Sequence, residues 1–425
     1  MRTVFKNGIL LDGTEHMQPI PNIDIAVTDD KITHIGTVLP EQNDRVIDLN
    51  GRYLMPGLIN LHVHLPAGGK PKKKPMDAKK LSAFALKNRL TQAFALKLCE
   101  GYARTELMSG VTTIRTVGGL ANLDSILRDK ILQGKAIGPR ILASNFAVGV
   151  PGGHMDGSVA HAVTTEKEAV ELVRTLAAGG ADLIKLMITG GVLDAEVKGS
   201  PGVLKMPPEI VKACCDEAHR LGLSVAAHAE GPEGVRVAVM NGVDTIEHGS
   251  VLDREEVEVL RRHNAAVICT ISPAVPMAKF DMELLGIDET VQYNSNVVYE
   301  NMISGVKTAL ENGIPVGLGT DTGCPYTTHY NMWRELHFFR KAAGVSAEFA
   351  LHTATLKNAR IAGIDHITGS IEVGKCADIL ITEQNPLSDF RALSEPYIVV
   401  GNGTIIQKPK IKKYAGCDLE LDRIM

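Results

Sequence analysis

The segment LINLHVH, residues Leu58–His64, is an apolar run that ends in two histidines spaced one residue apart. Such a run predicts a strand buried on both faces, which is typical of a parallel sheet covered by helices. Side chains at positions i and i+2 of a strand face the same side, so His62 and His64 could chelate one ion. The pair alone is weak evidence, because two histidines in a strand are often merely packed.

From about Leu58 to about Ala362, short apolar runs alternate with helical patterns, so the chain has α/β character. The predicted strands are Leu58–His64, Thr112–Gly118, Arg140–Asn145, Leu183–Thr189, Ser224–Glu230, Thr245–Gly249, Ala265–Ser272 and Pro315–Asp321. Helical periodicity fills most gaps, for example Glu166–Ala178, Pro208–Leu221, Asp253–His263 and Val298–Asn312. Eight such units predict a closed (β/α)8 TIM barrel. The alternative, an open doubly wound sheet, usually needs a G-x-G-x-x-G loop after its first strand, and HVHLPAGG lacks that spacing.

Both ends of the chain carry short alternating or apolar runs separated by turn residues, which predicts strands joined by tight turns. The predicted strands are Val4–Phe5, Ile23–Thr28, Lys31–Ile35 and Arg45–Leu49 at the start, and Ala377–Thr382, Tyr397–Val400 and Thr404–Gln407 at the end. Asn402-Gly403 is a typical hairpin turn.

The bulk composition indicates an ordinary globular protein. Hydrophobic residues make up 44% of the 425 residues, charged residues 22%, and the formal net charge is −4, so nothing points to a nucleic-acid or membrane partner. The seven cysteines lack C-x-x-C spacing, and the segment MRTVFKNGILLDG lacks the apolar core of a secretory signal. We therefore expect a cytoplasmic protein. The Lys-rich stretch Lys70–Lys74 is predicted to be a solvated loop, with attraction of an anionic substrate as the alternative.

In a catalytic barrel, the reactive side chains should cluster where strands end. Metal-type side chains do follow this rule: His62, His64, Lys185, His228, His248 and Asp321 lie at or near the ends of predicted strands. Six positions together are much harder to dismiss than one histidine pair, so we predict a metal site at the barrel mouth.

Two of these residues have alternative interpretations. Lys185 could be a buried lysine whose ammonium pairs with a carboxylate, but desolvation lowers a lysine pKa, and a neutral amine can react with carbon dioxide to give a carbamate that bridges two cations. Asp321 could cap the following helix, or it could ligate a metal and act as general base toward water and then as acid toward a leaving amine. Hydroxide generated between two cations would be the nucleophile.

The run GRYLMPGLINLHVHL resembles the opening of the metal-dependent hydrolases of the amidohydrolase superfamily. The segments GVTTIRTVGG, DLIKLMITGG, HAEGPEGVRVAVMNGVDTIEHG, GLGTD and GSIEVGKCADILI fit the same family in order. The resemblance covers nearly the whole chain, and it is strongest to the branch with imidazolonepropionase-like proteins and Xaa-Pro (prolidase-like) or Xaa-Lys/Arg dipeptidases. It implies a (β/α)8 barrel over residues 57–364, beside a small β-sandwich formed by residues 1–56 and 365–425.

The resemblance also implies roles for the site residues. His62, His64 and Asp321 would hold the more buried metal, His228 and His248 the more exposed one, and carboxylated Lys185 would bridge them. Two zinc ions are the expected cofactors. His154, in the loop GVPGGHMDG, would hold a substrate carboxylate or carbonyl, unless it is simply a solvated loop histidine.

The sequence departs from the dipeptidase branch at two positions. Where a tyrosine often polarises the substrate carbonyl, this chain has Glu230, which could pair with Arg236 or with a cationic substrate group. In GVTTIRTVGG, Thr116 stands where an aspartate is common. Both departures bear on the substrate and neither involves the metal ligands.

The leading function is hydrolysis of an amide-type C–N bond in a small molecule such as a dipeptide or an N-acyl amino acid. A cyclic-amide (lactam or imidazolone) hydrolase or a deaminase is the alternative, although deaminases of this superfamily usually use one metal and lack the lysine. A metal-free scaffold is the alternative from another class, but it should have lost ligands. We also expect a homo-oligomer, as is common in the family.

Overall fold

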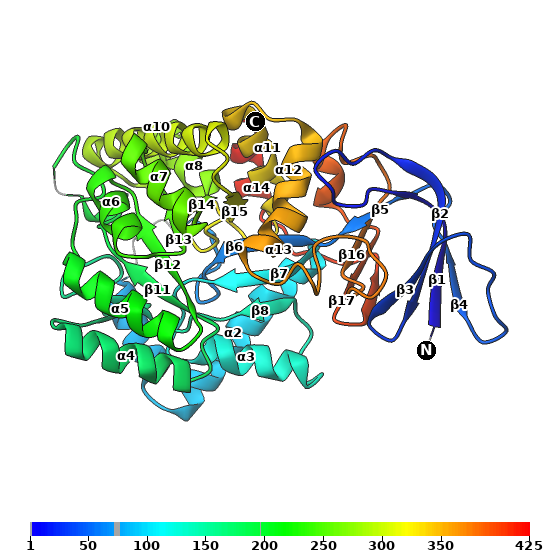
Figure 1. Ribbon diagram of the computed structural model, residues 1–425, viewed down its shortest axis with the longest axis horizontal. Coiled ribbons are helices and arrows are strands. Elements are labelled where there is room, and N and C mark those ends of the chain that lie inside the picture. The colour runs from blue at the N-terminus through cyan, green and yellow to red at the C-terminus, as the bar shows by residue number, and fades with distance from the viewer. Residues whose placement is uncertain (1, 72–76, 196) are drawn as a thin grey trace.

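The protein has a mixed α/β fold, seen in a computed structural model that describes residues 2–71, 77–195 and 197–425 (Figure 1). Most of the Lys-rich stretch 70–74, predicted as a loop, lies outside the described residues. The strands form three sheets of eight, seven and three members.

The eight-stranded sheet is built from both ends of the chain, in the order β18-β17-β16-β5-β1-β2-β3, with β4 paired to β1. In Figure 1, blue strands from the start and orange strands from the end lie together at one end of the molecule. Its strands are β1 (Arg2–Leu10), β2 (Ile20–Thr28), β3 (Lys31–Gly36), β4 (Arg45–Asp48), β5 (Tyr53–Pro56), β16 (Ile379–Thr382), β17 (Ile398–Gly401) and β18 (Thr404–Gln407). Strand β5, which has no counterpart in the predicted set, joins the two chain ends because it pairs with both β1 and β16.

Parallel strands from the middle of the chain form the other two sheets. The three-stranded sheet holds β6 (Leu58–Val63), β7 (Val111–Thr116) and β8 (Arg140–Leu142). The seven-stranded sheet runs in the order β10-β9-β11-β12-β13-β14-β15, with β9 (Ala147–Gly149), β10 (Ala160–Ala162), β11 (Leu183–Met187), β12 (Ser224–Ala229), β13 (Thr245–His248), β14 (Ala266–Cys269) and β15 (Val316–Leu318). Every residue of β6, β7 and β11 is buried, as expected for strands covered on both faces.

The ladders do not close these two sheets into a ring within the described residues. One isolated bridge, Val63 to Thr322, connects β6 with the segment after β15. On the other side, the amide of Asp182 donates to the carbonyl of Ala143 at 2.7 Å between β8 and β11. The closed barrel and the β-sandwich therefore stay predictions.

Helices fill most gaps between the parallel strands, and α11 to α14 follow the last of these strands. They are α1 (Ala78–Leu86), α2 (Arg89–Met108), α3 (Leu123–Leu132), α4 (Glu166–Ala178), α5 (Pro208–Arg220), α6 (Pro232–Met240), α7 (Arg254–His263), α8 (Ile271–Lys279), α9 (Met282–Leu285), α10 (Glu289–Glu311), α11 (Met332–Ala343), α12 (Ala347–His352), α13 (Asn358–Ile361) and α14 (Ala415–Asp422). Helix α7 begins as the sequence predicts, since Asp253 caps its first turn in a capping box with Glu256.

All eight predicted strands of the middle region end one to three residues later than the observed strands, and for two of them the structure shows the cause. The predicted strand Arg140–Asn145 ends at Leu142, because the Ala143 amide donates to the Asp182 carboxylate instead of to a neighbouring strand. The predicted strand Ala265–Ser272 ends at Cys269. Helix α8 begins there because the Glu335 carboxylate accepts from the amides of Ile271 and Ser272, which are free donors at a helix N-terminus.

None of the helices in the described ranges combines the length and the apolar character that crossing a bilayer requires.

Candidate metal centre

The predicted ligands lie at or near the carboxyl ends of the parallel strands, apart from Lys185, which lies in the middle of its strand. His62 lies in β6 and His64 directly after it, Lys185 lies in β11, and His228 lies in β12. The two remaining residues adopt left-handed backbone conformations, with φ of 67° at His248 and 54° at Asp321. Residues without a glycine's freedom rarely adopt this conformation, and when they do the strain often lies at a functional site.

One group of side chains converges on Asp321. Its Oδ1 lies 3.4 Å from Nε2 of His62 and 3.2 Å from Nε2 of His64. Burial by itself would raise the pKa of Asp321, whereas positive charge on the side of His62, His64 and His248 holds it well below its usual value; since His62 and His248 are neutral near pH 7, a bound cation would have to supply that charge. Asp321 is therefore an ionised acceptor. It does not cap a helix, since α11 begins at Met332 with Asn331 at its N-cap.

Hydrogen bonds on the far side of each ring set the tautomers of these histidines. Nδ1 of His62 donates to Oε2 of Glu247 at 2.7 Å, and Nδ1 of His64 donates to the carbonyl of Gly118 at 2.9 Å. Since a carboxylate and a carbonyl only accept, each ring keeps the lone pair on Nε2, facing Asp321. Burial lowers the pKa of His62 to about 4, so the ring is neutral near pH 7, as a metal ligand must be.

A fully buried lysine lies at the centre of this cluster. Lys185 is 1% exposed, and its Nζ has no hydrogen-bond partner among the described residues. The interpretation in which its ammonium pairs with a carboxylate is therefore not realised. Burial lowers the pKa of Lys185 to about 8, which makes the neutral amine accessible. An unsatisfied buried amine beside Asp321 and Glu247 is the observation that fits a modified, metal-bridging lysine.

A second group of ligand atoms comes from His228, Glu230 and His248, all within 4.8 Å of one another. Nδ1 of His248 lies 2.7 Å from Oγ1 of Thr270, so its Nε2 faces the cluster. Nε2 of His228 donates to the carbonyl of Gly190 at 3.3 Å, which leaves the lone pair on Nδ1. His62, His248 and Asp321 form a further set within the same distance, so the structure brings all the predicted metal ligands into one neighbourhood.

His154 lies against this cluster. Its ring stacks on that of His228, with centroids 4.2 Å apart and planes 8° apart, and its Nδ1 is hydrogen-bonded to Asp194. Asp194 also accepts from the Gly191 amide at 2.8 Å and lines a cavity of about 220 Å³, together with residues such as Gly191, Val203 and Lys205. His154 is thus held by a carboxylate at the edge of the cluster and is not a free loop histidine.

The predicted pairing of Glu230 with Arg236 is wrong. The Arg236 guanidinium contacts Glu255 at 2.8 Å and Asp253 at 3.5 Å on α7 and its cap, because position 236 lies on the half-exposed face of α6. Burial, together with Asp321, raises the pKa of Glu230 to about 8, and its Oε2 has no partner within the described part of the chain.

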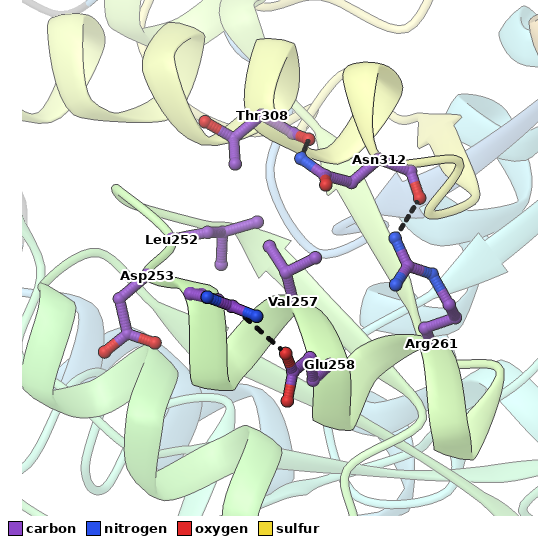
Figure 2. A pocket seen from close by; sticks show the side chains of 8 residues that line it. Leu252, Asp253, Val257, Glu258, Arg261, Thr308 and Asn312 are labelled. Carbon is purple, nitrogen blue, oxygen red and sulfur yellow. Dashed lines mark hydrogen bonds and ion pairs between the residues drawn. The ribbon is translucent and has the colours of Figure 1, made fainter.

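A larger hollow, of about 340 Å³, lies between α7 and α10 (Figure 2). It is lined by residues with surface contacts, such as Arg254 with Glu258 and Arg261 with the Asn312 carbonyl. Its lining includes none of the clustered histidines, so we assign the chemistry to the cluster.

Several supporting residues were missed from the sequence. Glu247, in β13, accepts from His62 and forms a buried ion pair with Arg115 of β7 at 2.6 Å. Burial alone would raise the pKa of Glu247, but Arg115 and His62 hold it below its usual range. A charged residue inside an otherwise buried strand was the available signal for both. Thr270 and Asp194 gave no comparable signal, since Thr270 lies in the connection after β14 and Asp194 in a short 3-10 helix, Val192–Asp194, outside the predicted strands.

Comparison with known proteins places this geometry in context. Residues 53–406 match the model of the amidohydrolase family. The crystal structure of a putative prolidase from Bifidobacterium longum is 36% identical with a TM-score of 0.87, covering 100% of this chain and 98% of that one. A Xaa-Pro dipeptidase structure with bound methionine in the active site is 29% identical with a TM-score of 0.82, covering 96% and 100%. An ochratoxinase from Aspergillus niger is 25% identical over 93% of this chain and 84% of the fungal protein.

Proposed function

The chain belongs to the amidohydrolase family and is a hydrolytic enzyme acting on C–N bonds, and from this premise we propose that it cleaves an amide bond of dipeptides or N-acyl amino acids with two divalent cations. The observation that carries this proposal is the cluster of four histidines and Asp321 around the unpartnered Nζ of Lys185.

The donors suit zinc, which takes neutral imidazole and carboxylate ligands. In the proposal, His62, His64 and Asp321 hold one cation, His228 and His248 hold the other, and a carboxylated Lys185 bridges them. Cations at such a site polarise a carbonyl oxygen and lower the pKa of water.

The remaining steps fall to this chain's own side chains. Asp321, whose pKa is depressed, accepts the proton of the attacking water and then delivers it to the departing amine. His154, held by Asp194, donates from Nε2 to the substrate carboxylate or carbonyl. The cavity of about 220 Å³ beside Asp194 has the size for one side chain of a small substrate.

The proposal includes the finer architecture. Residues 57–364 form a (β/α)8 barrel, and residues 1–56 and 365–425 form a β-sandwich. We further propose a cytoplasmic homo-oligomer that acts on a small molecule and uses neither a nucleic-acid nor a membrane partner.

The test is a screen of zinc-loaded protein against dipeptides and N-acyl amino acids, with lactams and lactones beside them. Release of a free amino acid from an open-chain amide supports the proposal. Cleavage of lactams or lactones without any open-chain amide would instead favour a cyclic-amide hydrolase.

Metal analysis of the same protein separates the proposed hydrolase from a deaminase and from a metal-free scaffold. About two cations per chain are expected for the proposed hydrolase, about one for a deaminase, and none for a scaffold that has lost its chemistry.

A further inference from the structure

Glu230 is the acidic residue of the cluster to which the proposed chemistry assigns no role. It follows the last residue of β12, two positions after His228, so the two side chains leave the same side of the strand. A carboxylate oxygen of Glu230 lies within 4.8 Å of a ring nitrogen of His228 and of His248.

The carboxyl group of Glu230 is only half satisfied by the described residues, since the backbone amide of Val192 donates to it while Oε2 has no hydrogen-bond partner. Oε2 is buried without a hydrogen bond in the part of the chain that the structure describes, and the guanidinium of Arg236 pairs with Glu255 of α7 instead. A buried polar atom left in this state is costly unless a ligand satisfies it.

We propose that Glu230 is the third protein ligand of the second cation, together with His228 and His248. The inference rests on the proposed two-metal function. It adds a carboxylate ligand where the family resemblance assigns only two histidines and the bridging lysine.

The chemistry of the donor set supports this assignment. Two histidines and one glutamate, with a fourth position open, form a known type of catalytic zinc site. Nδ1 of His248 is hydrogen-bonded to Thr270, so only Nε2 of this ring is available as a metal ligand, and we assign Nε2 to the second cation. His62, His64 and Asp321 then form the first site.

This arrangement differs in one measurable way from a second site made of two histidines and the bridging lysine alone. Each cation has three ligands that need no chemical modification, so the second cation binds whether or not Lys185 is carboxylated. Lys185 bridges two cations that each have three other protein ligands, and it is not required for the second cation to bind.

The test measures zinc binding and needs no substrate. Wild type, Glu230→Gln, Glu230→Asp and Lys185→Ala are dialysed against buffered zinc, and bound metal is counted by mass spectrometry. Cobalt(II) absorption reports the coordination of the same sites. Glu230→Gln should keep one cation and bind the second at least about 100-fold more weakly, beyond the range of outer-shell substitutions. Lys185→Ala should keep two.

The control is Glu106→Gln, another buried glutamate, whose carboxylate contacts His329 and Asn60, neither of which is a proposed metal ligand. It should bind two cations as wild type does. Glu230→Asp keeps the charge on a shorter side chain, and its intermediate affinity would separate loss of a ligand from loss of folding.

Two results would overturn the inference. Glu230→Gln could hold both cations with wild-type affinity, which would show that Glu230 is not a metal ligand. Lys185→Ala could lose the second cation by itself. Neither result depends on the substrate screen, so a wild type that holds two cations but cleaves no amide would contradict the proposed function alone.

Discussion

Glu247 shows how much of this site depends on residues that touch no substrate. Its carboxylate is fully buried. One oxygen accepts a hydrogen bond from Nδ1 of His62, and the other forms an ion pair with Arg115. Arg115 also donates to the Leu61 carbonyl at 2.8 Å. One charge pair therefore connects β6, β7 and β13 and sets the orientation of a predicted ligand.

Replacing Glu247 by Gln should be strongly destabilising. Breaking a buried ion pair leaves the Arg115 guanidinium uncompensated, at a cost of about 3–5 kcal/mol, and loosens His62 enough to weaken zinc binding about 10- to 100-fold. Urea unfolding and zinc titration measure the two effects. Wild-type stability in this variant would contradict the role given to the pair.

The same pair predicts a pH dependence. Because the folded-state pKa of Glu247 is depressed, its stabilising contribution is complete above the ordinary glutamate pKa and is lost as pH falls below it. Unfolding free energies of wild type and Glu247→Gln should therefore converge in acid. A difference that stays constant down to low pH would contradict this linkage.

Lys185→Ala should lose hydrolytic activity by more than the roughly 100-fold that outer-shell changes produce, because the bridging group is gone. Added acetate or propionate should restore part of the activity, since a small carboxylate fits the space of the missing carbamate. Steady-state kinetics with and without the carboxylate provide the measurement, and full activity in the unsupplemented variant would contradict the bridging role.

At the scale of residues, the sequence predicted which candidate ligands lie close together. It did not predict every residue that hydrogen-bonds to these ligands and fixes their orientation. The histidines, Lys185 and Asp321 follow from their place at strand ends, because parallel strands bring these ends together. The Asp194–His154 contact could not be foreseen, since it joins a turn to a short 3-10 helix, neither of which has a recognisable period. The Glu230–Arg236 pairing failed because a helix, unlike a strand, turns Arg236 toward α7.

At the scale of elements, α10 lies directly against the loop that follows His248. A Cβ built on Gly305 would lie 1.9 Å from the backbone carbonyl oxygen of Ser250, so only glycine permits this approach. The helix thus fixes the backbone next to His248, whose φ is already left-handed.

Gly305→Ala should destabilise the protein and weaken zinc binding, because α10 must move away from Ser250. Gly101→Ala is the matched control, since that helical glycine in α2 has open space around it. The control should gain up to about 1 kcal/mol from helix propensity. Thermal unfolding of both variants measures the contrast, and equal behaviour would contradict the packing argument.

The limits of prediction at this scale have a physical cause. Helices such as α4 and α7 follow from periodicity and capping residues, whereas the ends of β8 and β14 depend on Asp182 and Glu335, which are distant in sequence. Strands β9 and β10 have three residues each, too few for a period to be recognised.

At the scale of the whole molecule, the ion pair of Arg140 with Asp378, at 3.1 Å, links β8 to the sheet made by the chain ends. The family model extends across both regions, and the sequence predicted strands at both ends. It could not predict how they interleave, because β5 pairs with partners on either side that are far apart along the chain.

Removal of metal should lower the stability of the whole chain. Ligands that bind only the folded state stabilise it by about 2.7 kcal/mol at 100 times their Kd. Protein stripped by a chelator should therefore unfold at lower temperature than zinc-loaded protein, and added zinc should restore the transition. An unchanged Tm after verified metal removal would contradict a metal site built into the fold.

The interleaved sheet has a consequence for biosynthesis. Pro56 pairs with Ile379, so the strand that completes this edge of β5 is synthesised about 320 residues after β5 itself. At about 5–20 residues per second, that delay is roughly 16 to 65 s. During this interval the nascent chain exposes an incomplete apolar sheet, to which chaperones can bind. Messages truncated before codon 379 should therefore yield aggregates instead of a folded fragment.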